Sequence, residues 1–143
     1  MSSTEYDPLR TVVRTVLQKR SGSSDSESIV SAARGAHEDL AGVMVPLVGD
    51  VGLRALSSRA VHIAQRDFFS GSVRPIANDG TSDAIEAWLK QLEQSRVMEA
   101  ALTMFSALGG LLGNFIGESL TVRLLQKAWP DGFPDPESKE TQT

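Results

Sequence analysis

A chain of 143 residues, 41% of them hydrophobic and 22% charged, can bury the core of one globular domain and is not composed like a disordered protein. Its formal net charge of −4 gives no general attraction to phosphate backbones, so we expect no nucleic acid as a partner. The absence of cysteine excludes disulfides, thiolate nucleophiles and Cys-based zinc sites, and with no apolar run near the N-terminus it favours a cytoplasmic protein.

The first expected helix begins at Pro8, which suits a first turn, with Asp7 placed to cap it. Its apolar residues repeat at helical spacing and share one face: Leu9, Val12, Val13, Val16 and Leu17. The opposite face is basic: Arg10, Arg14, Lys19 and Arg20. Residues 21–28, read SGSSDSES, have no apolar side chain to bury. Residues 1–28 are therefore predicted to be an amphipathic helix on a flexible Ser-rich linker.

The core domain is predicted over residues 29–129 and opens with a second helix. Its apolar residues alternate between spacings of four and three, as in a helix packed along a neighbour: Ile29, Ala33, Ala36, Leu40, Val43 and Leu47. Pro46 should kink or end this helix, and Gly49 with Asp50 predicts a stop and a new cap. A third helix then buries Leu53, Leu56, Ala60, Ile63, Ala64 and Phe68.

A loop rich in Gly, Ser, Asn and Pro is predicted over residues 70–81. Asp83 and Glu86, three positions apart, resemble a capping box that opens a fourth helix. Its inward residues are expected to be Ile85, Trp88, Leu89 and Leu92. The apolar phase is lost at Ser95 and Arg96, which indicates a break.

The segment Ala100–Gly117 is the most hydrophobic part of the chain, with eighteen residues and no charge. Its length reaches the lower limit for spanning a bilayer, so a membrane-inserting helix is one alternative. Thr103, Ser106, Asn114 and the glycines interrupt it. We favour a central helix buried on all sides, at the centre of an all-α bundle of five or six helices.

Gly109, Gly113 and Gly117 recur every four residues, which would align them on one helix face for close packing. A break at Gly117 is the competing interpretation, because Ile116-Gly117-Glu118 echoes Val48-Gly49-Asp50. The echo continues from Arg54 to Arg123 with a one-residue offset, and we interpret it as two similar helix starts rather than two related units. A last helix from Glu118 should end at Trp129, and residues 130–143 are predicted to be a mobile tail.

The chain lacks two common sequence motifs of enzymes. There is no G-x-S-x-G elbow and no phosphate-binding G-x-x-x-x-G-K-[ST] loop, so no enzymatic activity and no cofactor are expected. The two histidines, His37 and His62, have Arg34 and Arg59 three residues before them, which excludes the Glu-x-x-His pattern of di-iron bundles. We therefore predict no metal site.

The stretch from Ala33 to Leu40, read ARGAHEDL, resembles the phosphoacceptor helix of one class of bacterial histidine kinases. The resemblance implies that His37 accepts a phosphoryl group and that Glu38 helps to deprotonate it. It covers only this short stretch, and Gly35 stands where that pattern has a larger helix former. A packing histidine at the edge of the apolar stripe is the alternative that we favour.

A basic face is predicted on the third helix, formed by Arg54, Arg59, His62 and Arg66. Such a stripe is a candidate surface for an anion or an acidic partner. Solvated arginines on an outward face are the alternative.

Two stretches, residues 45–68 (VPLVGDVGLRALSSRAVHIAQRDF) and 115–130 (FIGESLTVRLLQKAWP), are similar to stretches of small uncharacterised bacterial proteins. That resemblance favours a bacterial source and implies no activity. By elimination, we expect a non-enzymatic interaction or regulatory module that binds a protein partner or itself, as a homodimer. A phosphotransfer or dimerisation module using His37, and membrane insertion through Ala100–Gly117, stay open as alternatives.

Overall fold

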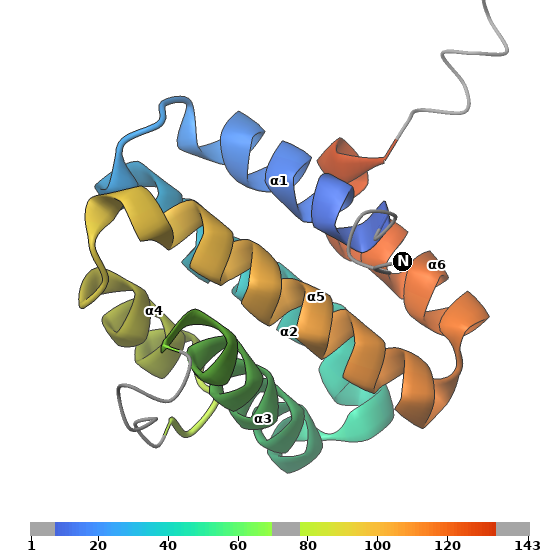
Figure 1. Ribbon diagram of the computed structural model, residues 1–143. Helices are drawn as coiled ribbons and strands as arrows, with labels where there is room; N and C mark the ends of the chain where they lie inside the picture. The colour runs from blue at the N-terminus through green and yellow to red at the C-terminus, as the bar shows by residue number, and fades with distance from the viewer. Residues whose placement is uncertain (1–7, 70–77, 134–143) are drawn as a thin grey trace, which may run out of the picture.

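The structure, a computed structural model, describes residues 8–69 and 78–133 (Figure 1). Within these residues six α-helices and two 3₁₀ turns form, and no strand does: α1 (Pro8–Ser21), α2 (Ser26–Val48), α3 (Asp50–Phe69), α4 (Ser82–Lys90), η2 (Gln94–Arg96), α5 (Val97–Ile116), α6 (Glu118–Ala128) and η3 (Pro130–Gly132). The prediction of an all-α bundle of five or six helices is confirmed. The predicted cap at Asp7, the burial of Phe68, most of the 70–81 loop and the tail from residue 134 lie outside what the structure describes.

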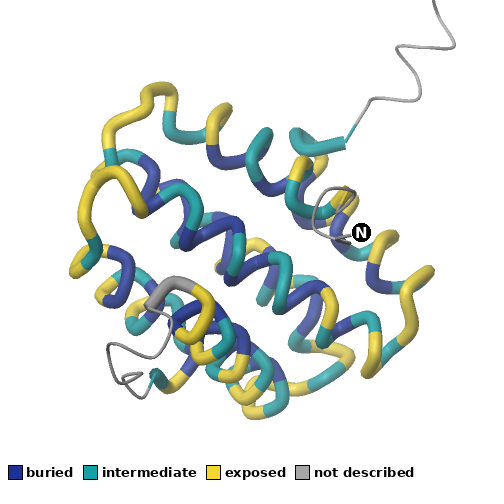
Figure 2. Tube along the Cα trace, viewed as in Figure 1, coloured by how far each residue is buried: buried dark blue, intermediate teal, exposed yellow. Residues whose placement is uncertain are grey.

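Two long helices, α2 and α5, form the centre of the bundle. Figure 1 shows them running in the same direction, and each one contacts the other and all four remaining helices. The predicted central helix is therefore α5, but α2 shares its position. Both helices carry many of the buried residues, and Figure 2 shows these positions in dark blue along the middle of the bundle. Burial of these apolar stripes supplies the main driving force for packing the outer helices.

The bundle consists of two similar three-helix units, α1–α2–α3 and α4–α5–α6. A shift of 68 positions, the interval from Gly49 to Gly117, places buried residues of α2 and α3 on buried residues of α5 and α6. The buried pairs are Ile29/Val97, Ala32/Ala100, Ala33/Ala101, Ala36/Met104, His37/Phe105, Leu40/Leu108, Met44/Leu112, Leu53/Thr121, Ser57/Leu125, Ala60/Ala128 and Val61/Trp129. A shift of 72 does the same for α1 and α4: Val13/Ile85, Val16/Trp88 and Leu17/Leu89.

The turn between the second and third helices has the same backbone conformation in both units. Gly49 between α2 and α3 has φ 85° and ψ 156°, and Gly117 between α5 and α6 has φ 96° and ψ 147°. Each glycine N–H donates to the carbonyl four residues earlier, at 2.8 Å to Val45 and 2.9 Å to Gly113. This backbone region is nearly restricted to glycine, because a Cβ would be strained there. The echo between the two corners therefore coincides with a backbone geometry that both corners share, and two similar helix starts remain our interpretation of it.

The first helix is part of the bundle rather than a separate mobile element. α1 contacts α2, α5 and η3, and its buried residues join the common core. Two of its arginines, Arg10 and Arg14, form ion pairs with the Glu99 carboxylate of α5. The predicted linker is also shorter than expected, because α2 begins at Ser26. Asp25 caps it, accepting a 2.7 Å hydrogen bond from the Ser28 N–H, as short acidic side chains do at helix starts.

The predicted tail begins with ordered packing. η3 contacts α1, and Gly132 lies so close to the Val12 and Val16 side chains that a Cβ would collide with them. The Trp129 ring is buried, its Nε1–H donates to the Ala36 carbonyl at 2.9 Å, and Phe105 meets it edge-on. The described chain thus stays in the bundle as far as residue 133.

Three local predictions need correction. The cap of α4 is Thr81, whose Oγ1 accepts from the Ala84 N–H at 3.1 Å, and Asp83 lies inside the helix. Pro46 lies inside α2, which continues to Val48 before the corner. Leu47, predicted on the packed seam, is 52% exposed, because none of the described helices covers its side chain at this end of α2.

One segment, Gln94–Ile116, is long and apolar enough to cross a membrane by length and composition alone. A core helix of a soluble bundle passes the same test. In this fold nine residues of α5 are buried in the common core, among them Leu102, Phe105 and Leu108. Only 39% of the most apolar window is buried, so α5 is not buried on all sides as expected, and membrane insertion stays an alternative prediction.

Candidate functional site

His37 lies in the middle of α2, and its ring is held between hydroxyl groups of two other helices. Its Nδ1 is 2.7 Å from Ser82 Oγ at the start of α4, and its Nε2 is 3.0 Å from Ser57 Oγ in α3. A neutral imidazole donates through one nitrogen and accepts through the other, so both hydroxyls can be satisfied together. The three residues form a closed polar junction between α2, α3 and α4, which we call the His37 junction.

The junction is buried. His37 is 3% exposed and Ser57 is 0% exposed. Burial lowers the pKa of His37 to about 4, because the imidazolium would lose its water shell. The ring is therefore neutral at neutral pH, and no carboxylate among the described residues hydrogen-bonds to it. A nucleophilic serine needs access to substrate, which the packing of Ser57 denies.

The predicted phosphoacceptor role of His37 fits this arrangement poorly. A kinase must reach one ring nitrogen, but both are occupied inside the junction. Glu38, expected to assist deprotonation, instead pairs with Arg34 at 3.2 Å. In the second unit the positions of His37 and Ser57 hold Phe105 and Leu125, so the junction replaces an apolar layer. The geometry favours the packing role.

Arg34 extends the polar contact between α2 and α4. Its Nη1 is 2.5 Å from Asp83 Oδ1 and 2.7 Å from Glu86 Oε1. The carboxylates of Asp83 and Glu86 raise the pKa of the guanidinium above its ordinary value. With the His37–Ser82 hydrogen bond, these pairs fix the first turns of α4 against α2.

The predicted basic face lies on α3 as expected. Arg54 is paired with Asp50 in the same helix, at 3.1 Å. Arg59, His62 and Arg66 are exposed and form no ion pair with any residue that the structure describes. Arg54, Arg59, His62 and Arg66 therefore share one helix and reach solvent, whereas an anion-binding role stays a prediction.

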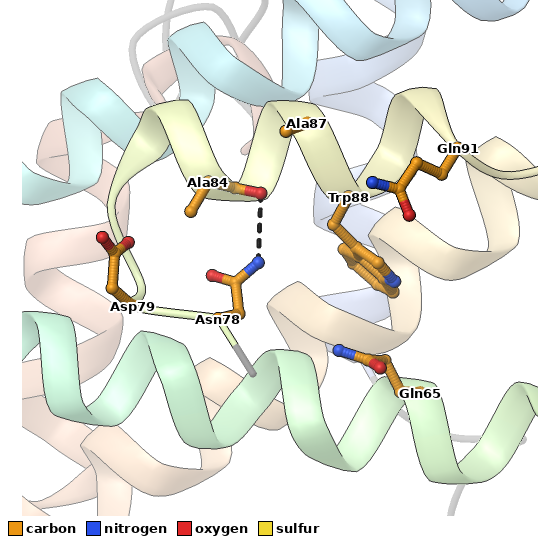
Figure 3. Close-up of a pocket in the computed structure, with 7 residues that line it drawn as sticks. All are labelled: Gln65, Asn78, Asp79, Ala84, Ala87, Trp88 and Gln91. Carbon is orange, nitrogen blue, oxygen red and sulfur yellow. Dashed lines mark hydrogen bonds between the residues drawn. The ribbon is translucent and has the colours of Figure 1, made fainter. Parts of the chain in front are cut away.

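A shallow pocket of about 480 Å³ lies between α3, α4 and the turn that precedes α4 (Figure 3). In Figure 3 Trp88 descends from α4 towards Gln65, which rises from α3. Asn78 closes one side, and its Nδ2 donates to the Ala84 carbonyl at 3.0 Å. The Trp88 Nε1–H is buried without a hydrogen-bond partner among the described residues. The polar side chains that line this pocket are Gln65, Asn78, Asp79 and Gln91, whereas the Trp88 Nε1–H is shielded from solvent.

A larger groove of about 840 Å³ lies between α1, α5 and α6. Its lining is mainly apolar side chains and glycines: Leu9, Val12, Gly109, Gly113, Val122 and Leu125. We call it the glycine groove. Such a volume and lining are typical of small-molecule sites.

The three glycines predicted to pack closely behave differently. Gly109 does so: a Cβ there would collide with the Leu9 side chain of α1. Gly113 lines the groove with open space, and its nearest neighbour to an added Cβ is Glu118 Cα at 4.0 Å. Gly117 is the corner residue between two helices and has no close neighbour, so the close-packing prediction is wrong for it. Of the two alternatives for Gly117, the helix break is confirmed.

The large apolar side chains that are exposed gather at the two corners. Among the described residues these are Leu47 (52%), Val51 (71%), Phe115 (64%) and Val122 (39%). Each lies within five residues of Gly49 or Gly117, and Figure 1 shows both corners at the same end of the bundle. We call these four residues the corner face. Leu47 and Phe115 occupy equivalent positions, two residues before the corner glycine.

Within the part of the chain that the structure describes, no three His, Cys, Asp or Glu side chains are grouped to hold a metal ion. The sequence was compared with family models, curated proteins and solved structures. No family model, no curated protein and no solved structure matches it. The resemblance to small bacterial proteins therefore stays a prediction, and the surfaces described above are the basis for a proposed function.

Proposed function

We propose that this protein is a non-enzymatic interaction module that forms a homodimer through the corner face. The observation that carries the proposal is the position of Leu47, Val51, Phe115 and Val122, all at the corners. Scattered apolar residues are normal on a monomer, but a group of large ones at one end is typical of a protein interface. A cytoplasmic location remains part of this proposal.

The corner face continues the core of the bundle. Leu47 follows Leu40 and Met44 along α2, and Phe115 follows Leu108 and Leu112 along α5, at helical spacings of four and three. The two stripes thus extend beyond the core at the same end, where none of the elements in residues 8–69 and 78–133 covers Leu47 and Phe115. A second copy could complete this layer by burying the same side chains.

The repeat supports a second copy as the partner. Leu47 and Phe115 occupy equivalent positions at the two corners, whereas Val51 and Val122 correspond to Ser119 and Arg54, so one pair of the face is repeated. A two-fold dimer uses the same patch on both subunits, and a repeated patch meets that need more readily than an irregular one. Aromatic and aliphatic side chains without charge are also characteristic of interface centres.

The test is the molar mass in solution, measured by light scattering after size-exclusion chromatography over a wide concentration range. We expect a dimer for the full chain and a monomer for Leu47→Ser/Phe115→Ser. The matched control is Gln18→Ser/Ala87→Ser, which alters exposed residues of α1 and α4 and should remain dimeric. Circular dichroism confirms that each variant is folded. A monomeric wild type, or a dimer that survives the corner substitutions, would contradict the proposal.

A further inference from the structure

The glycine groove exists because the second unit lacks side chains that the first unit has. The 68-position shift places Gly113 where the first unit has Val45, and Gly109 where it has Ala41. Val45 belongs to α2, and its half-buried side chain fills space next to that helix. At Gly113 that space is open, with room for an added Cβ. The open space at Gly113 is therefore a local difference between the two units, and it forms part of the groove of about 840 Å³.

The walls of the groove are apolar and carry one sign of charge. Leu9 and Val12 of α1 face Val122 and Leu125 of α6 across the glycines. Glu118, in the first turn of α6, supplies the one charged side chain among the described residues that line the groove. Asn114 and Thr121 add polar groups nearby, and the Thr121 hydroxyl donates to the Gly117 carbonyl at 2.8 Å.

We propose that the glycine groove binds a small ligand with an apolar body and a positively charged amine. The body lies along Gly109 and Gly113 between the apolar walls, and the ammonium lies beside the Glu118 carboxylate. Burying an apolar body is favourable without specific contacts, whereas the charge of the ligand decides between binding and exclusion. An anionic ligand would place its charge next to Glu118 with no lining cation among the described residues to offset it.

The experiment uses a matched pair of fluorescent probes that emit in apolar surroundings: the trimethylammonium and the propionate derivatives of diphenylhexatriene. Each is titrated with the full chain at submicromolar probe concentration. We expect saturable enhancement for the cationic probe and binding at least about tenfold weaker for the anionic probe. Equal binding of both probes would overturn the charge assignment, and no saturable binding of the cationic probe would overturn the site.

Gly113→Val restores to the second unit the side chain that the first unit has at Val45. Its Cβ has room, since the nearest atom, the Glu118 Cα, is 4.0 Å away, and its methyl groups should occupy part of the groove and weaken binding of the cationic probe by about tenfold or more. The matched control is Gly42→Val, an exposed glycine of α2 with open space around it, which should leave the affinity unchanged. If Gly113→Val binds the probe like the wild type, the probe lies elsewhere and the proposal is wrong.

Glu118→Gln tests the carboxylate separately from the cavity. The cationic probe should bind about threefold more weakly, because Glu118 is exposed and its attraction is screened by water. The uncharged parent diphenylhexatriene should keep its affinity, and a loss of both would contradict the assigned role of the carboxylate. Self-association is measured independently by light scattering, so failure of the dimer and failure of this site are distinguishable.

Discussion

The two three-helix units have the same burial pattern but differ in the chemistry of one layer. In the first unit His37 and Ser57 form a buried hydrogen-bonded junction with Ser82. In the second unit the same two positions hold Phe105 and Leu125, and Phe105 packs edge-on against Trp129. A shared backbone arrangement thus tolerates either a satisfied polar layer or an apolar one.

The difference also separates stability from specificity. An apolar layer gains from every buried methylene, whereas a polar junction gains little net energy but requires one exact pairing of donors and acceptors. The first unit therefore specifies where α4 lies through His37 and Arg34, and the second unit supplies more of the packing energy through α5. Substitutions in three places, the apolar layer, the His37 junction and the two corners, would break or sharpen this contrast.

The largest effect is expected in the apolar layer. Phe105→Ala removes a buried ring that also contacts Trp129, so the free energy of unfolding should fall by about 3–5 kcal/mol, measured by denaturant titration. Phe105→Leu is the control and should cost less, because it keeps most of the apolar volume. A loss below about 1 kcal/mol for Phe105→Ala would show that this layer is not tightly packed.

The second effect is a pH dependence that belongs to the first unit. Burial lowers the pKa of His37 from 6.5 to about 4 in the folded state. Between these values the unfolded chain binds a proton that the folded chain does not, so stability falls as the pH drops from about 7 to about 4. The neutral His37 contributes on the order of 3 kcal/mol to the free energy of unfolding. This contribution is fully present above the unfolded pKa and is lost as the pH falls to the folded pKa.

His37→Phe, which copies the residue of the second unit, should flatten this part of the pH profile of the unfolding free energy. The matched control, His62→Phe, alters an exposed histidine of α3 and should keep the wild-type slope. Acidic residues titrate in the same range, so the difference between the wild type and His37→Phe isolates the junction. A wild-type slope in His37→Phe would assign the pH dependence to other groups.

The smallest effect concerns the corners, where the two units should respond alike. Gly49→Ala and Gly117→Ala each place a Cβ at positive φ. Each should therefore lower the free energy of unfolding by about 1–2 kcal/mol. Gly110→Ala, inside α5 and exposed, is the control and should be neutral or stabilising by up to about 1 kcal/mol. Unequal losses at the two corners, measured by thermal unfolding, would contradict their structural equivalence.

Local signals in the sequence were sufficient for the fold class. The apolar spacing, the corner at Gly49 and Asp50, and the break after Ile116 all depend on residues near one another in the chain, and the structure contains the helices that they predict. The capping prediction at Asp83 failed because Thr81 competes for the same role two residues earlier. Boundaries depend on such competition more than on periodicity.

The repeat and the sites needed tertiary information. The interval from Arg54 to Arg123 is one residue longer than the interval of 68 from Gly49 to Gly117. The burial pattern follows the interval of 68. Burial equates residues as different as His37 and Phe105, which identity cannot reveal. The partners of His37 lie 20 and 45 positions away in the sequence. The exposure of Leu47 depends on how the other helices are placed around the end of α2.

The way the units interlock has a consequence for folding. α1 contacts α5 as well as α2, α4 contacts α2 as well as α5, and α3 and α6 each pack on the central helix of the other unit. A fragment of either unit would expose the surfaces that the other one covers, so we expect neither half to fold by itself. Cut between α3 and α4, the protein should behave as two complementary fragments that gain their helical structure together, each acting as the template for the other.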